Sequence, residues 1–207
     1  MKILVFGATG RVGVNVTNYA LAQGHEVTAF IRDRTKITPQ HPHLTTVEGD
    51  IYHPVSVAAA LDGEFDAVVN TVGVDPFKPS TIVTDSVRTV VGAMSEAGIS
   101  RYLGITGTAQ MPNNIGGAIS AAVIRRSPIR HAVRDHDGAL RIITHSELAW
   151  TLAGCPYIRD GALTGQYRLS SSFPGGFKTI SPQDVADFLI RELTSRQHVQ
   201  QIVGIWY

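Results

Sequence analysis

The chain has 207 residues, of which 43% are hydrophobic and 17% charged, and its formal net charge is +1. This composition is typical of an ordinary globular domain, and the near-zero charge gives no field that would favour nucleic acid or an anionic membrane as a partner. The single cysteine, Cys155, excludes an internal disulfide. No apolar run approaches the roughly 20 residues that span a bilayer, and the first residues read as a strand and glycines rather than a secretory signal. We therefore expect one cytoplasmic domain over residues 1–207.

Short apolar runs alternate with segments of helical length along the chain. The expected strands are 2–6, 26–31, 44–49, 66–72, 101–106 and 147–153, with 204–207 as a further candidate. The expected helices are 11–24, 54–63, 79–98, roughly 135–146 and 181–195. Strands that are apolar throughout are typical of a parallel sheet covered on both faces. The alternation predicts an α/β fold with a doubly wound, mostly parallel sheet of the Rossmann type and helices on both faces.

Several helix ends can be placed from local chemistry. Gly24 and Gly98 stand where helices are commonly closed by a glycine. Ser181, Pro182 and Asp184 match an N-cap, the first helical position and the third, as in a capping-box-like start. Two stretches interrupt the alternation, 107–134 and 155–178, and both follow expected strands at their carboxyl ends. Because open α/β sheets bind ligands at that edge, we assign both stretches to the acceptor side.

The first expected strand runs into "GATGRVG", with glycines at 7, 10 and 13. The free N–H groups and the dipole at the start of the following helix favour a phosphate. Gly7 would make the sharp turn, Gly10 would let the backbone approach a diphosphate, and Gly13 would let the helix pack on the strand. Thr9, Arg11 and Val12 complete this candidate loop, with a hydroxyl and a guanidinium near the phosphates. The alternative is a turn with a purely structural role.

The second expected strand ends in "IRDRTK", which bears on the choice of dinucleotide. Sites for NAD usually place an acidic residue here for the ribose 2′-hydroxyl, whereas Arg32 suits the 2′-phosphate of NADP by charge and geometry. We predict NADP, with Arg32 as the 2′-phosphate ligand. Asp33 keeps NAD open as the alternative, and Arg34 and Lys36 fit a solvated loop.

The third and fourth expected strands supply further cofactor contacts. Asp50 and Ile51 follow the third strand, where the adenine would lie. Thr71, Val72 and Gly73 end the fourth strand, where the backbone would pass the adenosine ribose. Each of these loops is placed by its position in the fold alone.

These residues resemble the atypical short-chain dehydrogenase/reductases. "GATGRVG" with "RDRTK" is similar to the branch that contains NAD(P)H-binding flavin reductases and the nitrogen-metabolite-repression regulators. "SELAWTLAGCPYIRDGALTGQY" resembles the corresponding stretch of biliverdin-IXβ reductase/flavin reductase, with Pro156, Asp160 and 163–167 as the matching pieces. The resemblance covers nearly the whole chain.

The resemblance implies a nicotinamide site that includes Pro156, and a hydride acceptor of the flavin or tetrapyrrole kind in a shallow pocket. Two departures limit it. Flavin reductases of the family commonly carry a serine after the fifth strand, where this chain has Gly107 between Thr106 and Thr108. They also carry a histidine after the proline of the sixth strand, where this chain has Tyr157. We therefore expect a retained nicotinamide pocket with different acceptor contacts, which disfavours specific biliverdin reduction.

The main short-chain dehydrogenase mechanism pairs a Tyr with a Lys four residues later, and none of the six tyrosines has that partner. Acceptors that take a hydride while solvent supplies the proton, such as an oxidised flavin or a quinone, remain open. Thr106 and Thr108 could position the nicotinamide amide or the acceptor. Tyr157 could stack on the acceptor or hydrogen-bond it, or merely cap its strand. His136 could donate a proton or have only a surface role.

The cysteine, the arginines and the histidine pair give weaker indications of a functional site. We expect Cys155 to be a buried small residue, since no activating partner is evident. The arginines within 125–134 could attract a flavin phosphate or form a solvated helix face. His41 and His43 lack further ligands nearby, so we predict no metal.

The sequence thus favours an NADPH-dependent oxidoreductase acting on a flavin, quinone or similar planar small molecule, as a monomer or small homo-oligomer. The alternative is a redox-sensing regulator that binds the dinucleotide without turnover. The regulators of the resembled branch tend to carry an added C-terminal portion, which favours the reductase. A sugar-nucleotide epimerase would need the Tyr–Lys pair and a larger substrate domain.

Overall fold

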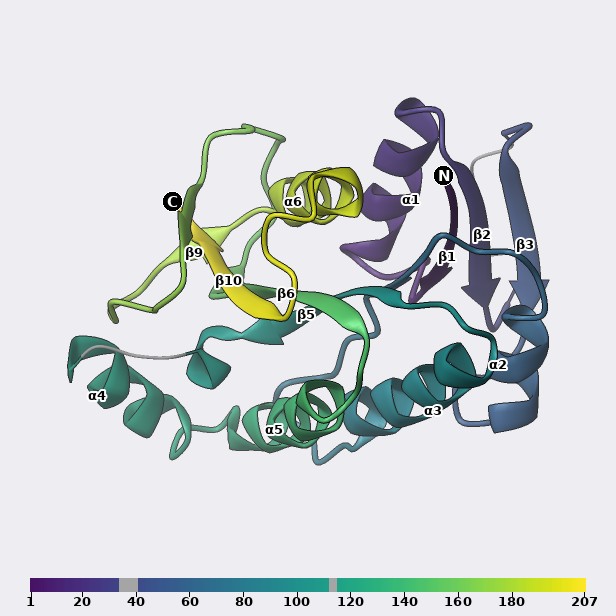
Figure 1. The fold of residues 1–207 in the computed structure, drawn as a ribbon. Coiled ribbons are helices and arrows are strands. Elements are labelled where there is room, and N and C mark those ends of the chain that lie inside the picture. Colours follow the sequence, from purple (N-terminus) through teal and green to yellow (C-terminus); the bar gives the residue numbers. More distant parts are fainter. Residues whose placement is uncertain (34–40, 112–114) are drawn as a thin grey trace.

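The computed structural model describes residues 1–33, 41–111 and 115–207. Its centre is a sheet with the strand order β3-β2-β1-β4-β5-β6-β10-β8, in which β8 alone runs antiparallel to its neighbour (Figure 1). The strands are β1 Lys2–Phe6, β2 Glu26–Ile31, β3 Leu44–Glu48, β4 Ala67–Asn70, β5 Arg101–Gly107, β6 Ala149–Cys155, β8 Arg168–Ser170 and β10 Gln201–Trp206. A second small sheet pairs β7, Tyr157–Ile158, with β9, Thr179–Ile180. The predicted doubly wound, mostly parallel sheet is confirmed.

Helices cover both faces of the sheet (Figure 1). One face carries α1 Gly13–Ala22 and α6 Pro182–Ser195, and the other carries α2 Pro54–Ala60, α3 Ile82–Glu96 and α5 Arg130–Thr144. Each face has its own buried apolar core, built from alternate residues of the same strands. A further helix, α4 Ile115–Ile124, lies beside the start of α5. Within the described ranges, no helix combines the length and the apolar character that a membrane crossing demands.

A carboxylate from α5 holds the amino end of α3. Asp135 is buried, and its two carboxylate oxygens accept the N–H groups of Val83 (3.1 Å) and Thr84 (2.8 Å). These N–H groups belong to the first turn of α3, where no partner within the helix exists. A Cβ on Gly138 would lie 2.3 Å from the Thr84 hydroxyl, so the glycine allows the two helices to approach this closely. Asp135 therefore caps α3 and locks α3 to α5.

The amino end of α6 has the predicted cap, and it also anchors two neighbouring segments of the chain. The Ser181 hydroxyl accepts the Asp184 N–H at 3.0 Å, and Pro182 occupies the first turn, as expected. The Asp184 side chain is fully buried and accepts the N–H groups of Thr164 (3.0 Å) and Gly165 (2.8 Å). It also accepts the hydroxyl of Tyr207. Asp184 thus fixes segment 163–167 and the end of β10 to α6.

Some expected boundaries are wrong, each for a local reason. The helix expected from about 135 begins at Arg130, because Ile129 starts it without a recognisable capping side chain. His136 therefore lies in the second turn of α5 and not near its start. Segments 107–134 and 155–178 contain α4, β7 and β8, none of which was predicted. The two strands have only two and three residues and so carry no periodicity, and α4 contains two adjacent glycines, which are unfavourable within a helix. Gly24 and Gly98 have positive φ, +77° and +71°, as expected for helix C-terminal glycines.

Candidate functional site

The sheet order places a crevice between β1 and β4. From β1 the chain runs outward through β2 and β3, and then returns to β4 on the other side of β1. At such a point, connections leave the carboxyl ends of neighbouring strands in opposite directions, and open α/β sheets bind ligands there. The glycine loop after β1 and residues 71–73 after β4 lie at this crevice.

The glycines of the loop are required by close backbone contacts. Gly7 has φ +73°, and a Cβ there would come within 2.7 Å of the carbonyl carbon of Thr71. A Cβ on Gly13 would lie 2.0 Å from the Gly7 carbonyl oxygen. The Gly10 N–H donates to that same oxygen at 2.9 Å and closes the turn. Gly7 makes the sharp turn as predicted, and Gly13 serves close packing of α1 against the turn.

Thr71 supports the turn from β4. Its N–H and its hydroxyl each lie 2.9 Å from the Phe6 carbonyl oxygen, and the hydroxyl is 3.2 Å from the oxygen of Gly7. The Thr71 side chain therefore holds the loop, and only its backbone continues toward the crevice. The next residues, Val72 and Gly73, leave the strand there, and a Cβ on Gly73 would meet no atom within 4 Å.

The amino end of α1 is open to a ligand. Its N-cap residue, Val12, is buried and has no side-chain atom that could accept from the first N–H groups. Thr9 and Gly10 are exposed next to it. Backbone N–H groups, a helix dipole and space where side chains are excluded together fit the diphosphate of a dinucleotide.

Arg11 joins the glycine loop to the chain beyond β6. Its guanidinium donates to the Asp160 carboxylate at 2.7 Å and to the Ile158 carbonyl oxygen at 3.3 Å. The Arg11 and Asp160 side chains are 60% and 90% exposed, so solvent screens this pair. In this arrangement Arg11 connects the loop to segment 155–178.

The carboxyl ends of β2 and β3 lie along the same edge of the sheet. Arg32 follows β2 directly and is exposed, whereas Arg34 and Lys36 lie outside the described residues. Asp50 accepts the Tyr52 N–H at 3.0 Å, and Ile51 is buried in the core. Arg32 and Asp50 thus lie at the carboxyl-end edge of the sheet, and Ile51 packs into the core beside them.

Thr106 and His136 meet in one narrow pocket between β5, β6, α3 and α5. The pocket has a free volume of about 10 Å³, room for roughly one water molecule. Its lining residues are Val87, Tyr102, Ile105, Thr106, His136, Ala139, Leu140, Ile143 and Leu152. The Thr106 hydroxyl and His136 Nδ1 are both buried, and neither finds a hydrogen-bond partner in the described part of the chain. Two unpaired polar groups in an apolar pocket are costly, which marks this place as a candidate for ligand chemistry.

Thr108 and Tyr157 lie outside this pocket. Thr108 is buried in the short turn Thr108–Gln110 that follows β5. Tyr157 opens β7 after the half-buried Pro156, and its side chain is 61% exposed. Cys155 is buried as expected, and burial raises the pKa of its thiol, which disfavours the reactive thiolate. The structure brings together only Thr106 and His136 of the four candidate catalytic residues.

A polar cluster beside the turn after β5 was not predicted. The Gln110 amide donates to Asp137 (2.9 Å) and to the Val133 carbonyl oxygen (3.1 Å). Arg125 pairs with Asp137 and donates to the Ala109 carbonyl oxygen at 3.0 Å. Burial raises the pKa of Asp137, but the hydrogen bonds from Arg125 and Gln110 outweigh it and leave that pKa below its ordinary value. The cluster fixes the turn that follows Thr106, and its members are too far apart in sequence to form a motif.

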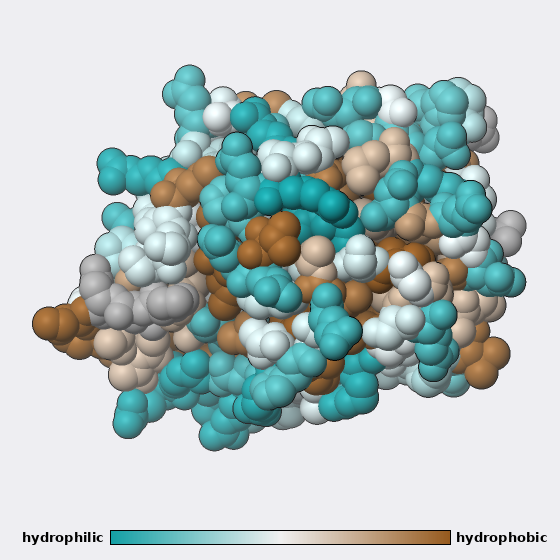
Figure 2. Space-filling view, viewed as in Figure 1, coloured by the Kyte–Doolittle hydropathy of each residue, from teal (hydrophilic) through white to brown (hydrophobic). Residues whose placement is uncertain are grey.

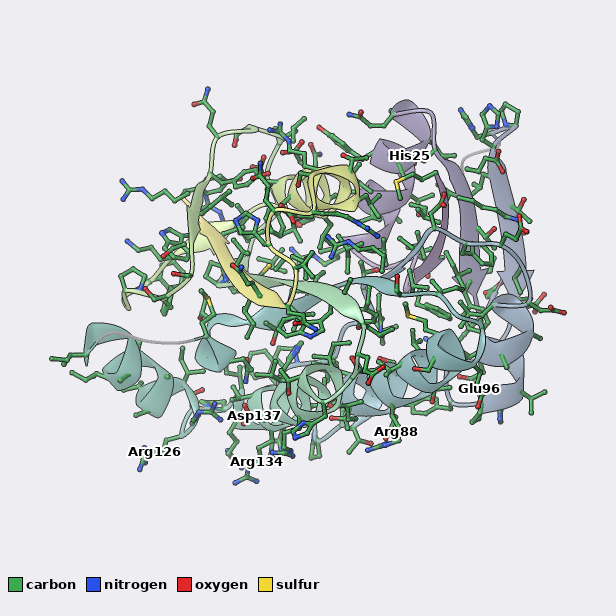
Figure 3. All side chains as sticks on the ribbon, in the orientation of Figure 1. His25, Arg88, Glu96, Arg126, Arg134 and Asp137 are labelled. Carbon is green, nitrogen blue, oxygen red and sulfur yellow. The ribbon has the colours of Figure 1, made fainter. Side chains whose placement is uncertain are left out.

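The other arginines of this region face solvent. Figure 3 shows Arg126, in the turn after α4, and Arg134, on α5, pointing outward, which agrees with their exposure. Arg130 is exposed as well. These three arginines face solvent, and both interpretations of them stay predictions, whereas Arg125 has the structural contacts described above. Of the histidine pair, His41 Nδ1 accepts the His43 N–H at 3.2 Å. Among residues 1–33, 41–111 and 115–207, no three potential ligands gather for a metal ion.

Comparison with known proteins identifies the family. The family model described as "NAD(P)H-binding" matches residues 7–196, most of the chain. Among curated proteins, the 3-beta-hydroxysteroid dehydrogenase of Mycolicibacterium neoaurum is 33% identical over 114 residues, which cover 49% of this chain and 31% of that protein. The protein YwnB of Bacillus subtilis is 31% identical over 111 residues, 54% of this chain and 49% of YwnB. The chain thus spans less than half the length of these curated relatives.

Solved structures match over the full fold. A putative epimerase from Bacteroides thetaiotaomicron has a TM-score of 0.84 and 27% identity, covering 100% of this chain and 96% of that one. The anaerobillin reductase ChuY from Escherichia coli O157:H7 has a TM-score of 0.82 at 24% identity, with coverages of 99% and 96%, a level that shows the fold alone. The glycine cradle, the open end of α1 and the family match agree, and the chain belongs to the NAD(P)H-binding family of Rossmann-fold proteins.

Proposed function

We propose that this chain is an NADPH-dependent reductase that passes a hydride to a flavin, a quinone or a similar planar acceptor, acting as one Rossmann domain over residues 1–207. The observation that carries the proposal is the glycine cradle beside the amino end of α1, whose close backbone contacts fit the phosphates of a dinucleotide. Thr106 is the penultimate residue of β5 and lies toward the same sheet edge as this cradle. The small pocket that Thr106 lines together with His136 has room for about one water molecule and not for a ring. NADPH, when bound, supplies the hydride.

The cofactor residues follow from their places along that edge. The backbone of Gly7, Gly10 and Gly13 and the amino end of α1 would hold the diphosphate. Arg32 would bind the 2′-phosphate, with Asp50 beside the adenine. We assign the backbone of Thr71, Val72 and Gly73 to the adenosine ribose, Pro156 to the nicotinamide side, and Thr106 to the carboxamide or the acceptor.

The remaining groups suit an acceptor that needs no protein acid. Burial lowers the pKa of His136, while Asp135 and Asp137 raise it less, so the ring is neutral at pH 7. A neutral ring is a hydrogen-bond partner for Thr106 or for a ligand, and a poor proton donor. Flavins and quinones can take the hydride and then a proton from water, so the site requires only alignment of the two rings.

The experiment that tests the function follows NADPH oxidation at 340 nm with FMN, riboflavin and a quinone as separate acceptors. Oxidation with at least one of them is the expected result. Tight NADPH binding without oxidation by any acceptor would contradict the reductase and favour a dinucleotide-binding regulator. The proposal includes a cytoplasmic protein that works as a monomer or small homo-oligomer.

Arg32→Ala is expected to weaken NADPH binding by about tenfold or more, because a charge-assisted hydrogen bond to a phosphate is among the stronger polar contacts. NADH has no 2′-phosphate, so its affinity should not change. Fluorescence titrations with both cofactors measure the two effects. Arg88→Ala, which removes an exposed arginine of α3, is the control. A wild-type protein that binds NADH more tightly than NADPH would refute the assignment.

The turnover number should stay level between about pH 7 and 8.5, because burial holds the pKa of His136 below its ordinary value and water supplies the proton. A protonated histidine acting as the acid would instead cause a fall of about tenfold per pH unit above its pKa. Initial rates at saturating NADPH across this range decide between the two. An inflection in the wild type that disappears in His136→Gln would contradict a neutral ring.

A further inference from the structure

Phe177 holds its aromatic ring in solvent beside Tyr157. The two side chains are 82% and 61% exposed, and their ring centroids lie 6.2 Å apart with planes inclined by 32°. Exposed aromatic rings in contact with each other form a flat apolar surface that can bind another ring. Neither ring packs into the hydrophobic core of the protein.

The backbone that presents Phe177 is anchored on both sides. Phe173 is buried and packs edge-on against Trp206 with centroids 5.6 Å apart. Gly175 has φ +90°, and a Cβ there would lie 2.6 Å from the Gly116 carbonyl oxygen, so the turn lies directly on α4. The Gly176 N–H donates to the Ser120 hydroxyl at 3.1 Å. The turn that carries Phe177 is therefore fixed by packing and hydrogen bonds.

Strand pairing fixes the two rings relative to each other. Tyr157 pairs with Thr179 in the small parallel sheet of β7 and β9, and Phe177 precedes Thr179 by two residues. Residues 157 and 177 are twenty positions apart, and this register places their backbones near each other. The closeness of the two residues is thus a property of the fold.

The aromatic pair adjoins the cofactor loop. β7 continues from the carboxyl end of β6, and Arg11 of the glycine loop donates to the carbonyl oxygen of Ile158, the residue after Tyr157. A ring lying on the pair would therefore be close to the sheet edge where the cofactor binds. The start of α4 next to this turn is also hydrophobic, as Figure 2 shows at the end of the molecule where Figure 1 places α4, and Ile115 and Ile119 are exposed there.

From this arrangement we propose that Phe177 and Tyr157 form a stacking platform for the planar ring of the acceptor, with Phe177 as a specificity-determining residue. This inference rests on the proposed reductase function. A phenyl ring offers no hydrogen bond, so the platform selects flat, delocalised ring systems by area and stacking, and it tolerates different polar substituents. Tyr157 accordingly contributes its ring, and its hydroxyl is dispensable.

The test measures ring binding without turnover. Riboflavin is titrated against the protein saturated with NADP⁺, which cannot deliver a hydride, and quenching of flavin fluorescence reports binding. We expect Phe177→Ala to weaken riboflavin binding by about tenfold or more, the size expected when a stacking partner is truncated. Phe177→Tyr and Tyr157→Phe keep the rings and should bind within about threefold of the wild type.

Matched controls separate the platform from other effects. Val55→Ala removes an equally exposed apolar side chain, 82% exposed on α2, and should leave riboflavin binding unchanged. NADP⁺ affinity should be the same in all variants. Unchanged riboflavin binding in Phe177→Ala, or a wild type that does not bind riboflavin, would overturn the proposal. A change of oligomeric state in Phe177→Ala with unaltered riboflavin binding would overturn it too, and would assign the ring to contact between copies. If no acceptor oxidises NADPH, the reductase function fails while this titration still decides the platform.

Discussion

Gly13→Ala is expected to weaken NADPH binding by about 100-fold or more, equivalent to about 2.7 kcal/mol. The added Cβ would stand 2.0 Å from the Gly7 carbonyl oxygen and 2.7 Å from the Thr71 hydroxyl. The Gly7 oxygen belongs to the turn and the Thr71 hydroxyl is hydrogen-bonded to it, so relief of the clash requires the loop to move away from α1. The N–H groups that would bind the diphosphate then no longer point at one place. Fluorescence titration with NADPH and a thermal melt measure the effects on affinity and stability.

Gly92→Ala is the matched control, because Gly92 lies within α3 and a Cβ there would meet no atom within 4 Å. It should leave NADPH affinity unchanged and stabilise the protein by about 0.5–1 kcal/mol, since alanine loses less backbone freedom than glycine in a helix. A Gly13→Ala protein with wild-type affinity would show that the phosphate does not bind at this loop.

Asp184→Ala should lower the free energy of unfolding by about 1.5–3 kcal/mol, the size expected when hydrogen bonds to a buried charged group are lost. It removes the carboxylate that accepts the N–H groups of Thr164 and Gly165 and the Tyr207 hydroxyl, all three on exposed residues. In a domain of this size the midpoint of thermal unfolding should fall by roughly 3 to 12 °C. Urea unfolding at pH 7 measures the loss, and Asp62→Asn, at an exposed aspartate, is the neutral control.

The Asp184 carboxylate also predicts how the stability of the protein depends on pH. Burial raises the pKa of Asp184, but hydrogen bonds from Tyr207, Gly165 and Thr164 outweigh it, and the pKa lies below its ordinary value. The unfolded chain therefore binds this proton more readily, and the stability that Asp184 contributes is present above about pH 4–5 and is lost as pH falls through the folded pKa. Asp184→Asn cannot titrate and should lose less stability than the wild type between pH 5 and about pH 3. Equal acid losses in the two proteins would contradict the role of Asp184.

Local chemistry is what made parts of the fold predictable. Within the "GATGRVG" turn, a Cβ on Gly10 or Gly13 would crowd the Gly7 carbonyl oxygen, so this part of the turn is specified locally, whereas the close contact of Gly7 is with Thr71. The start of α6 follows from Ser181, Pro182 and Asp184, whose interactions span three positions. The strands covered by helices on both faces could likewise be predicted, because each is a continuous run of apolar residues.

Contacts between distant residues could not be predicted. Asp135 caps α3 from 52 positions away, and Thr106 meets His136 only because β5 and α5 pack together. Phe177 stands in a turn, where a single aromatic residue has no periodic pattern to mark it. Its importance emerges only from the register of β7 and β9, strands of two residues each.

The capping of α3 and α6 also affects where an anion can bind. Each of these two helix starts already has a carboxylate of the protein, Asp135 at α3 and Asp184 at α6. An incoming phosphate would meet like charge there and would have to displace a buried carboxylate. The start of α1 has only Val12 and no such charge. If the proposed function is right, an anion is disfavoured at the starts of α3 and α6 and accommodated at the start of α1, and a carboxylate introduced at position 12 is expected to weaken NADPH binding.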